Sequence, residues 1–323
     1  MEHEISPKYP IEELSADKLP RQLKEITGRP KRLYSRGDES LLHGYAEGCV
    51  GSMSGMGSMI GSGSMIGGRK LLCVIGSRQY TPYGREACEM IIAGLRGYPI
   101  TIVSGLALGI DGIAHEAAIL AGLKTVAVLG SGLDDDSIYP ASNQHIARRI
   151  LAEGGCLVSE NPPGTRPAPY HFPARNRIMS GLSHATLVIE AKRPSGTLIT
   201  SQLATDQNRD ILAVPGSIFS EHAAGPHFLI SKGAAPVTCA HEVLVALGFE
   251  VEKIRGKARA STRVKPADLT IAENRLLNCL SHPKTRDRLI EELGWSASET
   301  NVTISLLEIK KLVVAGFNEI RKK

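Results

Sequence analysis

The segment FPARNRIMSGLSHATLVIEAKRPSGTLITS, residues 172–201, indicates the fold of the central part of the chain. It contains an apolar run typical of a buried strand, Ala185–Ile189, followed by a small-residue turn at 195–197 and a helical pattern. Such a turn leaves backbone N–H groups unpaired at the start of the helix, where they can hold a phosphate. Arg175 and Arg177 lie shortly upstream, on either side of Asn176. The segment therefore predicts a cradle for phosphate or for a nucleic-acid backbone.

The same succession of apolar run and small-residue turn recurs along the middle of the chain. The further runs are residues 71–75, 100–103, 125–129 and 211–214, and their turns begin at Gly76, Ser104, Gly130 and Pro215. Segments with helical length separate these runs, at 83–96, 112–121 and 143–153. Short apolar strands that alternate with helices predict a doubly wound parallel α/β sheet with both faces covered. Ligands of such sheets bind at the carboxyl ends of the strands, where these turns fall.

The composition limits the classes of protein to which the chain can belong. Its 323 residues carry a net charge of +5, and the length suits one α/β domain and a small second domain. The six cysteines are scattered without a close pair, which indicates buried free thiols in a reducing cytosol. No apolar run approaches the roughly 20 residues that cross a bilayer, and the polar N-terminus is no signal peptide. We expect a cytoplasmic protein without membrane contact, cofactor or metal.

Changes in composition divide the chain into five predicted parts. These are a short polar segment at 1–43, a Gly/Ser/Met-rich flexible insertion at 44–68, a Rossmann-like domain at 69–249, a basic linker at 250–266 and a small winged-helix domain at 267–323. The linker is rich in Lys and Arg, which is typical of a solvated segment and also favours contact with nucleic acid. In the last part, three helical patterns and a final apolar turn predict the winged helix. Its third helix offers Asn301 and Thr303 to DNA bases, while contact with another protein stays an open alternative.

Ten motifs in this order resemble those of the DNA-processing protein A family, DprA/Smf, and cover roughly residues 71–248. They are Gly76-Ser77-Arg78; Ser104-Gly105-Leu106-Ala107 with Gly109-Ile110-Asp111 and His115; Gly130-Ser131-Gly132-Leu133-Asp134; Tyr139-Pro140 with Asn143; Ser159-Glu160 with Pro162; Phe172-Pro173-Ala174-Arg175-Asn176-Arg177-Ile178; Gly181-Leu182-Ser183; Glu190-Ala191; Ser195-Gly196-Thr197-Leu198; and Ala213-Val214-Pro215-Gly216.

The resemblance implies an extended Rossmann fold that forms a homodimer, binds single-stranded DNA and helps to load a RecA-type recombinase in transformation or recombination. The chain departs from the family pattern at three places. His227 stands where the family has asparagine, Asn208 precedes Arg209 where the family has glycine, and the insertion 44–68 is atypical. A role outside natural transformation therefore stays open.

The turns and the resemblance together predict a site for single-stranded DNA. Arg78 is the expected phosphate contact, and Phe172 and Tyr139 offer surfaces on which bases can stack. Because Arg175 and Arg177 cannot face the same way, we expect one to bind DNA and the other to brace an acidic residue. The glycines can instead serve only close packing. The predicted set is Gly76, Ser77, Arg78, Ser104, Gly105, Gly130, Gly132, Tyr139, Asn143, Phe172, Arg175, Asn176, Arg177, Ser195, Gly196, Thr197 and Lys232.

A nucleotide-binding protein or enzyme that uses the same strand-end cleft is the alternative. The turn at 194–197 resembles that of cytokinin-activating phosphoribohydrolases, but Thr200 stands at the position of their catalytic glutamate. A threonine cannot supply the carboxylate that supports an oxocarbenium-like transition state. No turn spells G-x-G-x-x-G, which argues against a dinucleotide cofactor. His115 and Asp111 have the spacing to share a cation, but no third ligand lies near them in the sequence.

Overall fold

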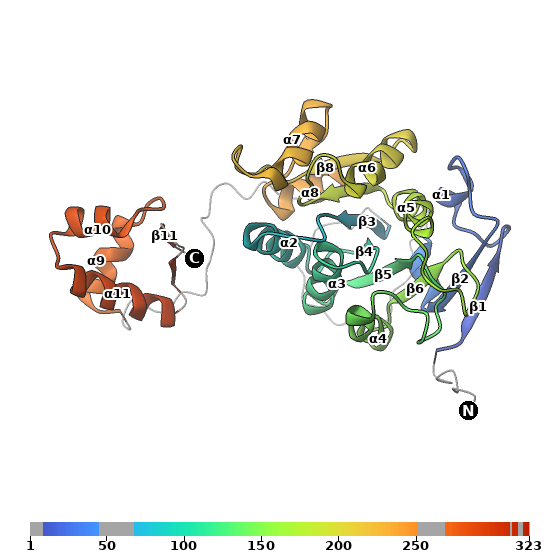
Figure 1. Cartoon of the computed structure of the whole chain (residues 1–323), viewed down its shortest axis with the longest axis horizontal. Coiled ribbons are helices and arrows are strands. Elements are labelled where there is room, and N and C mark those ends of the chain that lie inside the picture. Colours follow the sequence, from blue (N-terminus) through green and yellow to red (C-terminus); the bar gives the residue numbers. More distant parts are fainter. Residues whose placement is uncertain (1–8, 45–67, 251–268, 311, 316–318, 323) are drawn as a thin grey trace. The chain divides into compact units, whose positions relative to one another are not determined.

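The computed structural model describes residues 9–44, 68–250, 269–310, 312–315 and 319–322, and the chain divides into two compact units at residues 251 and 252. Figure 1 shows the helices and strands of both units. Nearly all of the predicted insertion 44–68 and of the predicted basic linker 250–266 lies outside the described residues. In the described ranges, no helix is long and apolar enough to span a membrane.

A nine-stranded sheet forms the centre of the first unit, in the order β1-β2-β6-β5-β4-β3-β7-β8-β9 (Figure 1). The strands from β3 to β9 pair in parallel, whereas β2 pairs antiparallel with both β1 and β6. The bounds are β1 Ile11–Ser15, β2 Arg32–Gly37, β3 Lys70–Ile75, β4 Ile100–Ser104, β5 Lys124–Leu129, β6 Cys156–Ser159, β7 Ala185–Val188, β8 Asp210–Ala213 and β9 Ala235–Pro236. The parallel part confirms the predicted doubly wound α/β fold.

Helices cover both faces of this sheet. On one face, α2, α3, α4 and α8 contribute to the apolar core, and on the other α1 and α5 do so, with α6 packed against α5. The bounds are α1 Arg21–Lys24, α2 Pro82–Gly94, α3 Ile110–Leu120, α4 Gln144–Ala152, α5 His171–Leu182, α6 Gly196–Asp206, α7 Ala224–Ser231 and α8 Ala240–Ala246, with short 3₁₀ helices η1 Glu39–Leu42, η2 Ala141–Asn143 and η3 Glu221–Ala223.

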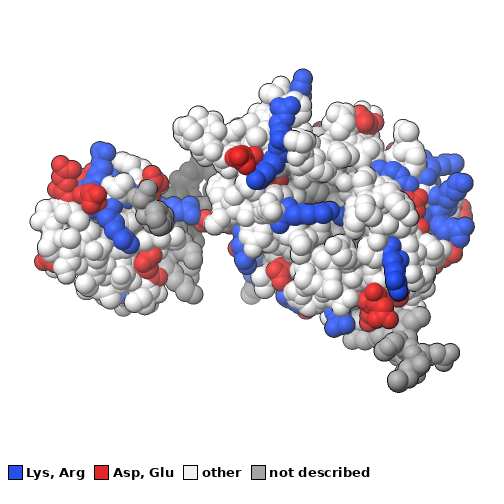
Figure 2. Space-filling view, in the orientation of Figure 1, with Lys and Arg blue, Asp and Glu red and all other residues white. Residues whose placement is uncertain are grey.

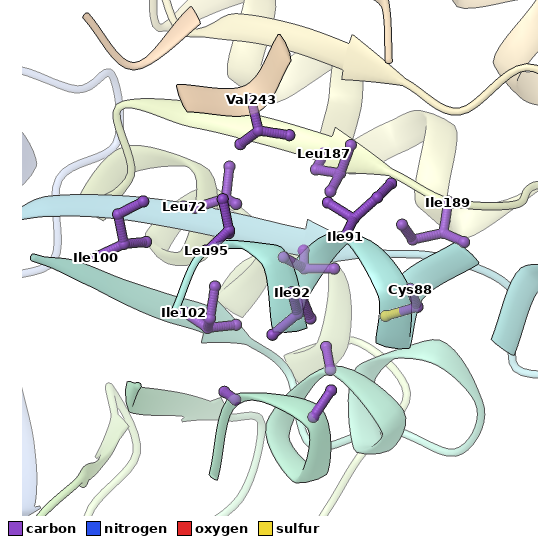
Figure 3. Packing of buried hydrophobic residues seen from close by; sticks show 14 of the residues in the cluster. Leu72, Cys88, Ile91, Ile92, Leu95, Ile100, Ile102, Leu187, Ile189 and Val243 are labelled. Atoms are coloured by element: carbon purple, nitrogen blue, oxygen red, sulfur yellow. The ribbon is translucent and has the colours of Figure 1, made fainter. Parts of the chain in front are cut away.

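Strand β3 shows why the parallel strands could be predicted from the sequence. Its side chains alternate between the two faces, so Leu72 belongs to the core under α2 while Leu71 belongs to the core under α5. Figure 3 shows the first of these cores, where Ile91 of α2 and Val243 of α8 lie near Leu72. Burial of each such side chain contributes roughly 1.5–3 kcal/mol to stability. A strand buried on both faces must be apolar throughout, which produces the continuous run.

The strand order reverses between β3 and β7. From β3 the chain adds β4, β5 and β6 on one side, and then returns to place β7 against the other side of β3. The loops that follow β3 and β7 therefore diverge toward opposite sides of the sheet. In open α/β sheets this divergence leaves a crevice at the carboxyl ends of the two strands.

The N-terminal residues belong to the first unit and form no separate polar segment. Strand β2 extends the sheet beside β6, and Leu23, Leu33 and Leu42 are fully buried. Arg36 of β2 is 3% exposed, and its Nη1 donates to the carboxylate of Asp135 at 2.6 Å. We predicted a short polar segment at 1–43. In the structure, residues 9–43 instead contribute two strands and several buried side chains to the first unit. Neither β1 nor β2 shows the continuous apolar run of a buried strand, because β1 has one buried residue and the four buried residues of β2 include Ser35 and Arg36.

The second unit contains three helices followed by a two-stranded antiparallel hairpin, the order predicted for a winged helix. The bounds are α9 Ile271–Cys279, α10 Arg286–Leu293, α11 Ala297–Ile309, β10 Val313–Ala315 and β11 Ile320–Lys322. Thr285 caps α10 and Ser296 caps α11 as expected, and Gly294 ends α10 in the left-handed conformation at φ 65°. Asn301 is exposed, but Thr303 is only 7% exposed and donates to a backbone carbonyl. Thr303 is therefore unavailable to DNA bases, contrary to our expectation.

Candidate nucleic-acid interface

A cleft of about 760 Å³ lies at the carboxyl ends of β3 and β7, where the strand order reverses. The loop after β3, the loop after β7, the first turns of α5 and α6, and residues near the start of α3 form its walls. In Figure 2, several Lys and Arg side chains cross the face of the first unit that is in view, where acidic side chains are fewer. Of the predicted site residues, the cleft brings together Gly76, Ser77, Arg78, Phe172, Arg175, Asn176, Ser195, Gly196 and Thr197.

Arg78 is the most accessible cation of this cleft. The hydroxyl of Ser77 accepts from the backbone N–H of Gln79 at 3.1 Å and donates to the carbonyl of the same residue at 2.7 Å, which closes a tight turn with Arg78 at its tip. The guanidinium carbon of Arg78 lies 5.7 Å from the ring centroid of Phe172, and that ring lies 5.8 Å from the ring of Tyr139. An exposed cation and two neighbouring aromatic rings are the elements of a phosphate contact beside a stacking surface.

The first turn of α6 forms the opposite wall. Ser195 precedes the helix, but its side chain makes no capping hydrogen bond, and its hydroxyl oxygen is buried without a partner among the described residues. The hydroxyl of Thr197 donates to the carbonyl of Gly76 at 3.2 Å and thereby ties this turn to the loop after β3. A Cβ atom on Gly196 would meet open space. The N–H groups of an uncapped first turn carry partial positive charge and suit an anion.

Arg175 lies at the base of the cleft and acts as a brace. It is 6% exposed, and its Nη1 donates to the carbonyls of Gly105 and Val128. Burial lowers the pKa of Arg175 and raises the pKa of nearby Asp111, and the attraction between the two groups opposes both shifts. The backbone N–H groups of Ala107 and Gly105 also oppose the rise in the pKa of Asp111. Through its two bonds to carbonyls, Arg175 holds the ends of two strands together.

Arg177 faces away from the cleft. Its Nη2 donates to both carboxylate oxygens of Glu160 at 2.8 Å, and its Nε donates to the carbonyl of Gly28 at 2.8 Å. The two arginines face different ways, as expected, but both are engaged within the protein. The expectation that one of them is a free DNA contact is not supported by this arrangement, because neither guanidinium is accessible in the way that Arg78 is.

Two predicted polar contacts are internal to the fold. Ser104 is fully buried, and its hydroxyl donates to the carbonyl of Val74 at 2.7 Å. The amide of Asn143 donates to the carbonyls of Leu106 and Ala107, each at 3.0 Å. Both side chains hold the turn after β4 in place. We therefore assign them a structural role and no longer a contact with DNA.

The predicted glycines of the loop after β5 also serve the fold. A Cβ on Gly130 would lie 3.1 Å from the ring of Phe172, so a glycine lets this ring pack closely. The backbone N–H of Gly132 donates to the carbonyl of Thr165 at 2.8 Å and cannot bind a phosphate. The alternative of close packing therefore describes these two glycines better than the predicted cradle.

A basic ridge beside the cleft is formed by Lys192, Arg193 and Lys232, of which the sequence analysis predicted Lys232 alone. Lys192 lines the cleft and pairs with the exposed carboxylate of Glu221 at 3.0 Å. Arg193 lies over the ring of Phe228, with its guanidinium carbon 3.9 Å from the centroid, and Lys232, the predicted rim contact, lies 5.9 Å from the same ring. Lys192 and Arg193 lie in the loop that follows β7, so their place at the carboxyl edge of the sheet could have been predicted from the sequence.

Three side chains that bear on the enzyme alternative, Thr200, Asp111 and His115, make contacts within the fold. Thr200 lines the cleft, and its hydroxyl donates to the carbonyl of Gly196 at 3.3 Å, as in an ordinary helical turn. Asp111 is the one carboxylate among the described lining residues, and it is buried beside Arg175. His115 is fully buried with its Nδ1 2.7 Å from the hydroxyl of Thr125. Within the part of the chain that the structure describes, no three His, Cys, Asp or Glu side chains are placed to hold a metal.

Residues 57–248, more than half of the chain, match the family described as DNA recombination-mediator protein A. This chain belongs to that family, DprA/Smf. Over 234 residues it is 36% identical to DNA processing protein DprA of Bacillus subtilis, and this match covers 72% of this chain and 70% of the relative. Over 178 residues it is 44% identical to protein Smf of Escherichia coli, and this match covers 55% of this chain. The match spans 47% of that second relative, about half of its length.

Solved structures of DprA proteins share the fold. The X-ray structure of DprA from Streptococcus pneumoniae matches with a TM-score of 0.61 and 36% identity, over 76% of each chain. A structure of DprA from Helicobacter pylori, described by its single-stranded DNA binding mode, matches with a TM-score of 0.60 and 26% identity, over 74% of this chain and 96% of that one. These likenesses confirm the predicted DprA family and the Rossmann-like fold.

The two substitutions in the DprA pattern have visible structural roles. His227 lies with its Nε2 3.1 Å from the carbonyl of Gly216, so it holds the loop after β8. Asn208 adopts a left-handed conformation at φ 54°, which asparagine tolerates better than most residues other than glycine. Arg209 donates to the carbonyl of Gly181 at 3.1 Å and so ties the start of β8 to α5.

Proposed function

We propose that this DprA-family protein binds single-stranded DNA in the cleft between β3 and β7 and delivers it to a RecA-type recombinase in the cytoplasm, during DNA uptake or recombination. The observation that carries the proposal is the arrangement around Arg78. This guanidinium is exposed and forms no ion pair with any described residue. It lies beside the ring of Phe172, which itself neighbours the ring of Tyr139, and the uncapped first turn of α6 lines the same cleft.

These features suit a phosphate backbone with unpaired bases better than a duplex. Phosphates need cations and free N–H groups, which Arg78, Lys192 and the turn at Gly196 supply on opposite walls. Unstacked bases need flat apolar surfaces, which Phe172 and Tyr139 supply. Bases in a duplex are already stacked and do not present their faces to side chains. The name of the DprA structure from H. pylori adds support, because it states a single-stranded DNA binding mode for that protein.

The test of this proposal is a salt titration of binding to a labelled single-stranded oligonucleotide, with duplex of the same sequence as competitor. We expect tight binding that weakens steeply with salt and that duplex fails to compete. Equal affinity for duplex, or no affinity for either, would reject the proposal and favour a nucleotide ligand. Release of a free base from a nucleoside monophosphate would support the hydrolase alternative in its place.

Recombinase delivery and homodimer formation are further parts of the proposal, and both rest on membership in the family. If the protein loads a RecA-type recombinase, it should shorten the lag before filament assembly on DNA that is coated with a single-strand-binding protein. If it is a homodimer, light scattering after size-exclusion chromatography should give twice the chain mass of 34.6 kDa. A protein that remains monomeric at micromolar concentration would contradict the dimer.

A further inference from the structure

The basic ridge leads from the cleft toward α7. Lys192 and Arg193 belong to the loop after β7, and Lys232 follows the last turn of α7. Lys192 and Pro194 line the cleft, whereas Arg193, which stands between them in the sequence, lies over α7 with its guanidinium carbon 3.9 Å from the ring centroid of Phe228. In Figure 2, basic side chains form a row from the middle of this face to its upper end, where Figure 1 places α7. The ridge therefore continues the positive charge of the cleft beyond its walls.

The outer part of the basic ridge holds two positive charges without an acidic partner. Arg193 and Lys232 contact the same ring, that of Phe228, so their charges lie within about 10 Å of each other, which is one Debye length at about 0.1 M salt. Both side chains are exposed. Among the ion pairs of the described residues, the one on the ridge joins Lys192 to Glu221, and none involves Arg193 or Lys232. Two like charges this close repel each other, and a bound anion relieves the repulsion.

This part of the ridge can hold a phosphate but does not stack a base. Arg193 covers a face of the Phe228 ring, and the ring itself is partly buried. A base needs an open aromatic face, which Phe172 and Tyr139 supply in the cleft and Phe228 does not supply here. Exposed Arg and Lys groups bind the charged backbone of a nucleic acid without reading its sequence.

Lys192 joins the cleft to the ridge, and its own partner is easily displaced. Its ammonium group lies 3.0 Å from the carboxylate of Glu221, and 42% of the Lys192 side chain and 81% of the Glu221 side chain are exposed. An ion pair as exposed as this one stabilises the fold little and is screened by salt. A phosphate can therefore take the place of the Glu221 carboxylate beside Lys192.

We propose that the basic ridge is a second binding site for the DNA backbone, which holds by its phosphates the part of a single strand that leaves the cleft over α7. The inference rests on the proposed binding of single-stranded DNA in the cleft. The cleft holds unpaired bases together with their phosphates, whereas the ridge holds phosphates alone. The protein therefore selects strands that are long enough to fill both sites, and it is indifferent to the bases that lie over the ridge.

The experiment compares salt titrations of binding for thymidine oligonucleotides of about 6 and about 20 nucleotides, since sites for single strands span roughly 4–16 nucleotides. The double variant Arg193→Gln/Lys232→Gln removes the two exposed charges of the ridge that do not line the cleft. With the long strand, the slope of log K against log salt concentration should become shallower by about 1.4, so the affinity gap to the wild type should narrow by roughly sevenfold between about 50 and about 200 mM salt. With the short strand, which fills the cleft alone, the slope should keep its wild-type value.

The matched control is Arg96→Gln/Arg148→Gln, which also removes two exposed charges. Arg96 lies between the end of α2 and the start of β4, at the opposite edge of the sheet from the ridge, and Arg148 belongs to α4. The control should keep the wild-type slope with both strands. An unchanged slope for the long strand in the ridge variant would overturn the inference, as would an equal change for both strands or an equal change in the control. A wild-type protein that binds neither strand would overturn the proposed function itself.

A strand with abasic flanks separates contacts to phosphates from contacts to bases. It carries about 6 central thymidines within a backbone of about 20 nucleotides, so the cleft can hold bases whichever way the strand runs. The wild-type protein should bind this strand with the slope of the full thymidine strand, and the ridge variant should again be shallower by about 1.4. Equal slopes for the two proteins on this strand would overturn the assignment of the ridge to phosphates.

Glu221→Gln provides an arm that loss of folding cannot imitate, because the expected effect is a gain. The substitution frees Lys192 and removes a carboxylate that repels phosphate. Affinity for the long strand should rise by roughly 1.5- to 5-fold at low salt, and the gain should vanish at high salt. Unchanged or weaker binding at low salt would contradict the part assigned to Lys192.

Discussion

Replacement of Arg78 by alanine tests the proposed DNA interface most directly. The guanidinium is exposed at the tip of its turn and lies over the ring of Phe172, so the substitution leaves no buried polar group without a partner. We therefore expect the folded unit to keep its stability. A charge-assisted hydrogen bond to a phosphate is worth about 2 kcal/mol, which corresponds to a roughly 30-fold loss of affinity at low salt.

The dependence on salt separates a phosphate contact from other causes of weaker binding. Each phosphate neutralised on a single strand contributes about 0.7 to the slope of log K against log salt concentration. Arg78→Ala should flatten the slope by that amount, so between about 50 and about 200 mM salt the affinity gap to the wild type should narrow by roughly 2.6-fold. The loss should be equal for strands of different sequence, because a phosphate contact carries no sequence information.

The assay is fluorescence anisotropy of a labelled oligonucleotide over a series of salt concentrations. Arg85→Ala is the matched control, because Arg85 is an exposed arginine of α2 that pairs with Glu89 at 2.8 Å and does not line the cleft. Arg78→Lys should restore the slope but only part of the affinity, since lysine keeps the charge without the planar fork. An unchanged slope in Arg78→Ala, or an equal flattening in Arg85→Ala, would refute the assignment.

Three further substitutions test the fold around the site. Leu42→Ala, at a fully buried N-terminal residue, should lower the free energy of unfolding of the first unit by about 2–5 kcal/mol in urea titrations; no loss would show that residues 9–43 are dispensable. Gly76→Ala should cost about 1–3 kcal/mol and weaken DNA binding, because its Cβ would lie 2.7 Å from the side chain of Ile110; wild-type behaviour in both assays would contradict this. Burial lowers the pKa of His115 to about 3. Below about pH 6.5 the unfolded chain therefore binds a proton at this histidine that the folded chain does not bind. The free energy of unfolding should decrease as the pH is lowered, by at most about 1.4 kcal/mol per pH unit. His115→Gln should make this decline shallower in unfolding curves between pH 7 and pH 5, whereas the exposed control His43→Gln should not.

Much of the first unit was predictable because its strands are buried on both faces. The runs at 71–75 and 185–189 are continuously apolar for this reason, and the glycine-containing turns after them mark the carboxyl edge of the sheet. Arg78 and the turn at 195–197 could be placed at one site because every parallel strand ends at the same edge. Strands β1 and β2 escaped notice for different reasons. The edge strand β1 has a single buried residue, and the buried centre of β2 includes the polar residues Ser35 and Arg36, so neither strand is an apolar run.

The sequence by itself determined the type of fold, the family and the edge of the sheet where binding groups gather, because these depend on local patterns of burial and on turns. Only the tertiary structure decided which of those groups are free. It places Arg175 against the carbonyls of two strand ends and Arg177 against Glu160, so two apparent DNA contacts are braces. It also places β7 beside β3, which opens the cleft at the carboxyl ends of these two strands. Pairing between segments more than 100 residues apart depends on packing of the whole sheet, and no local pattern contains that information.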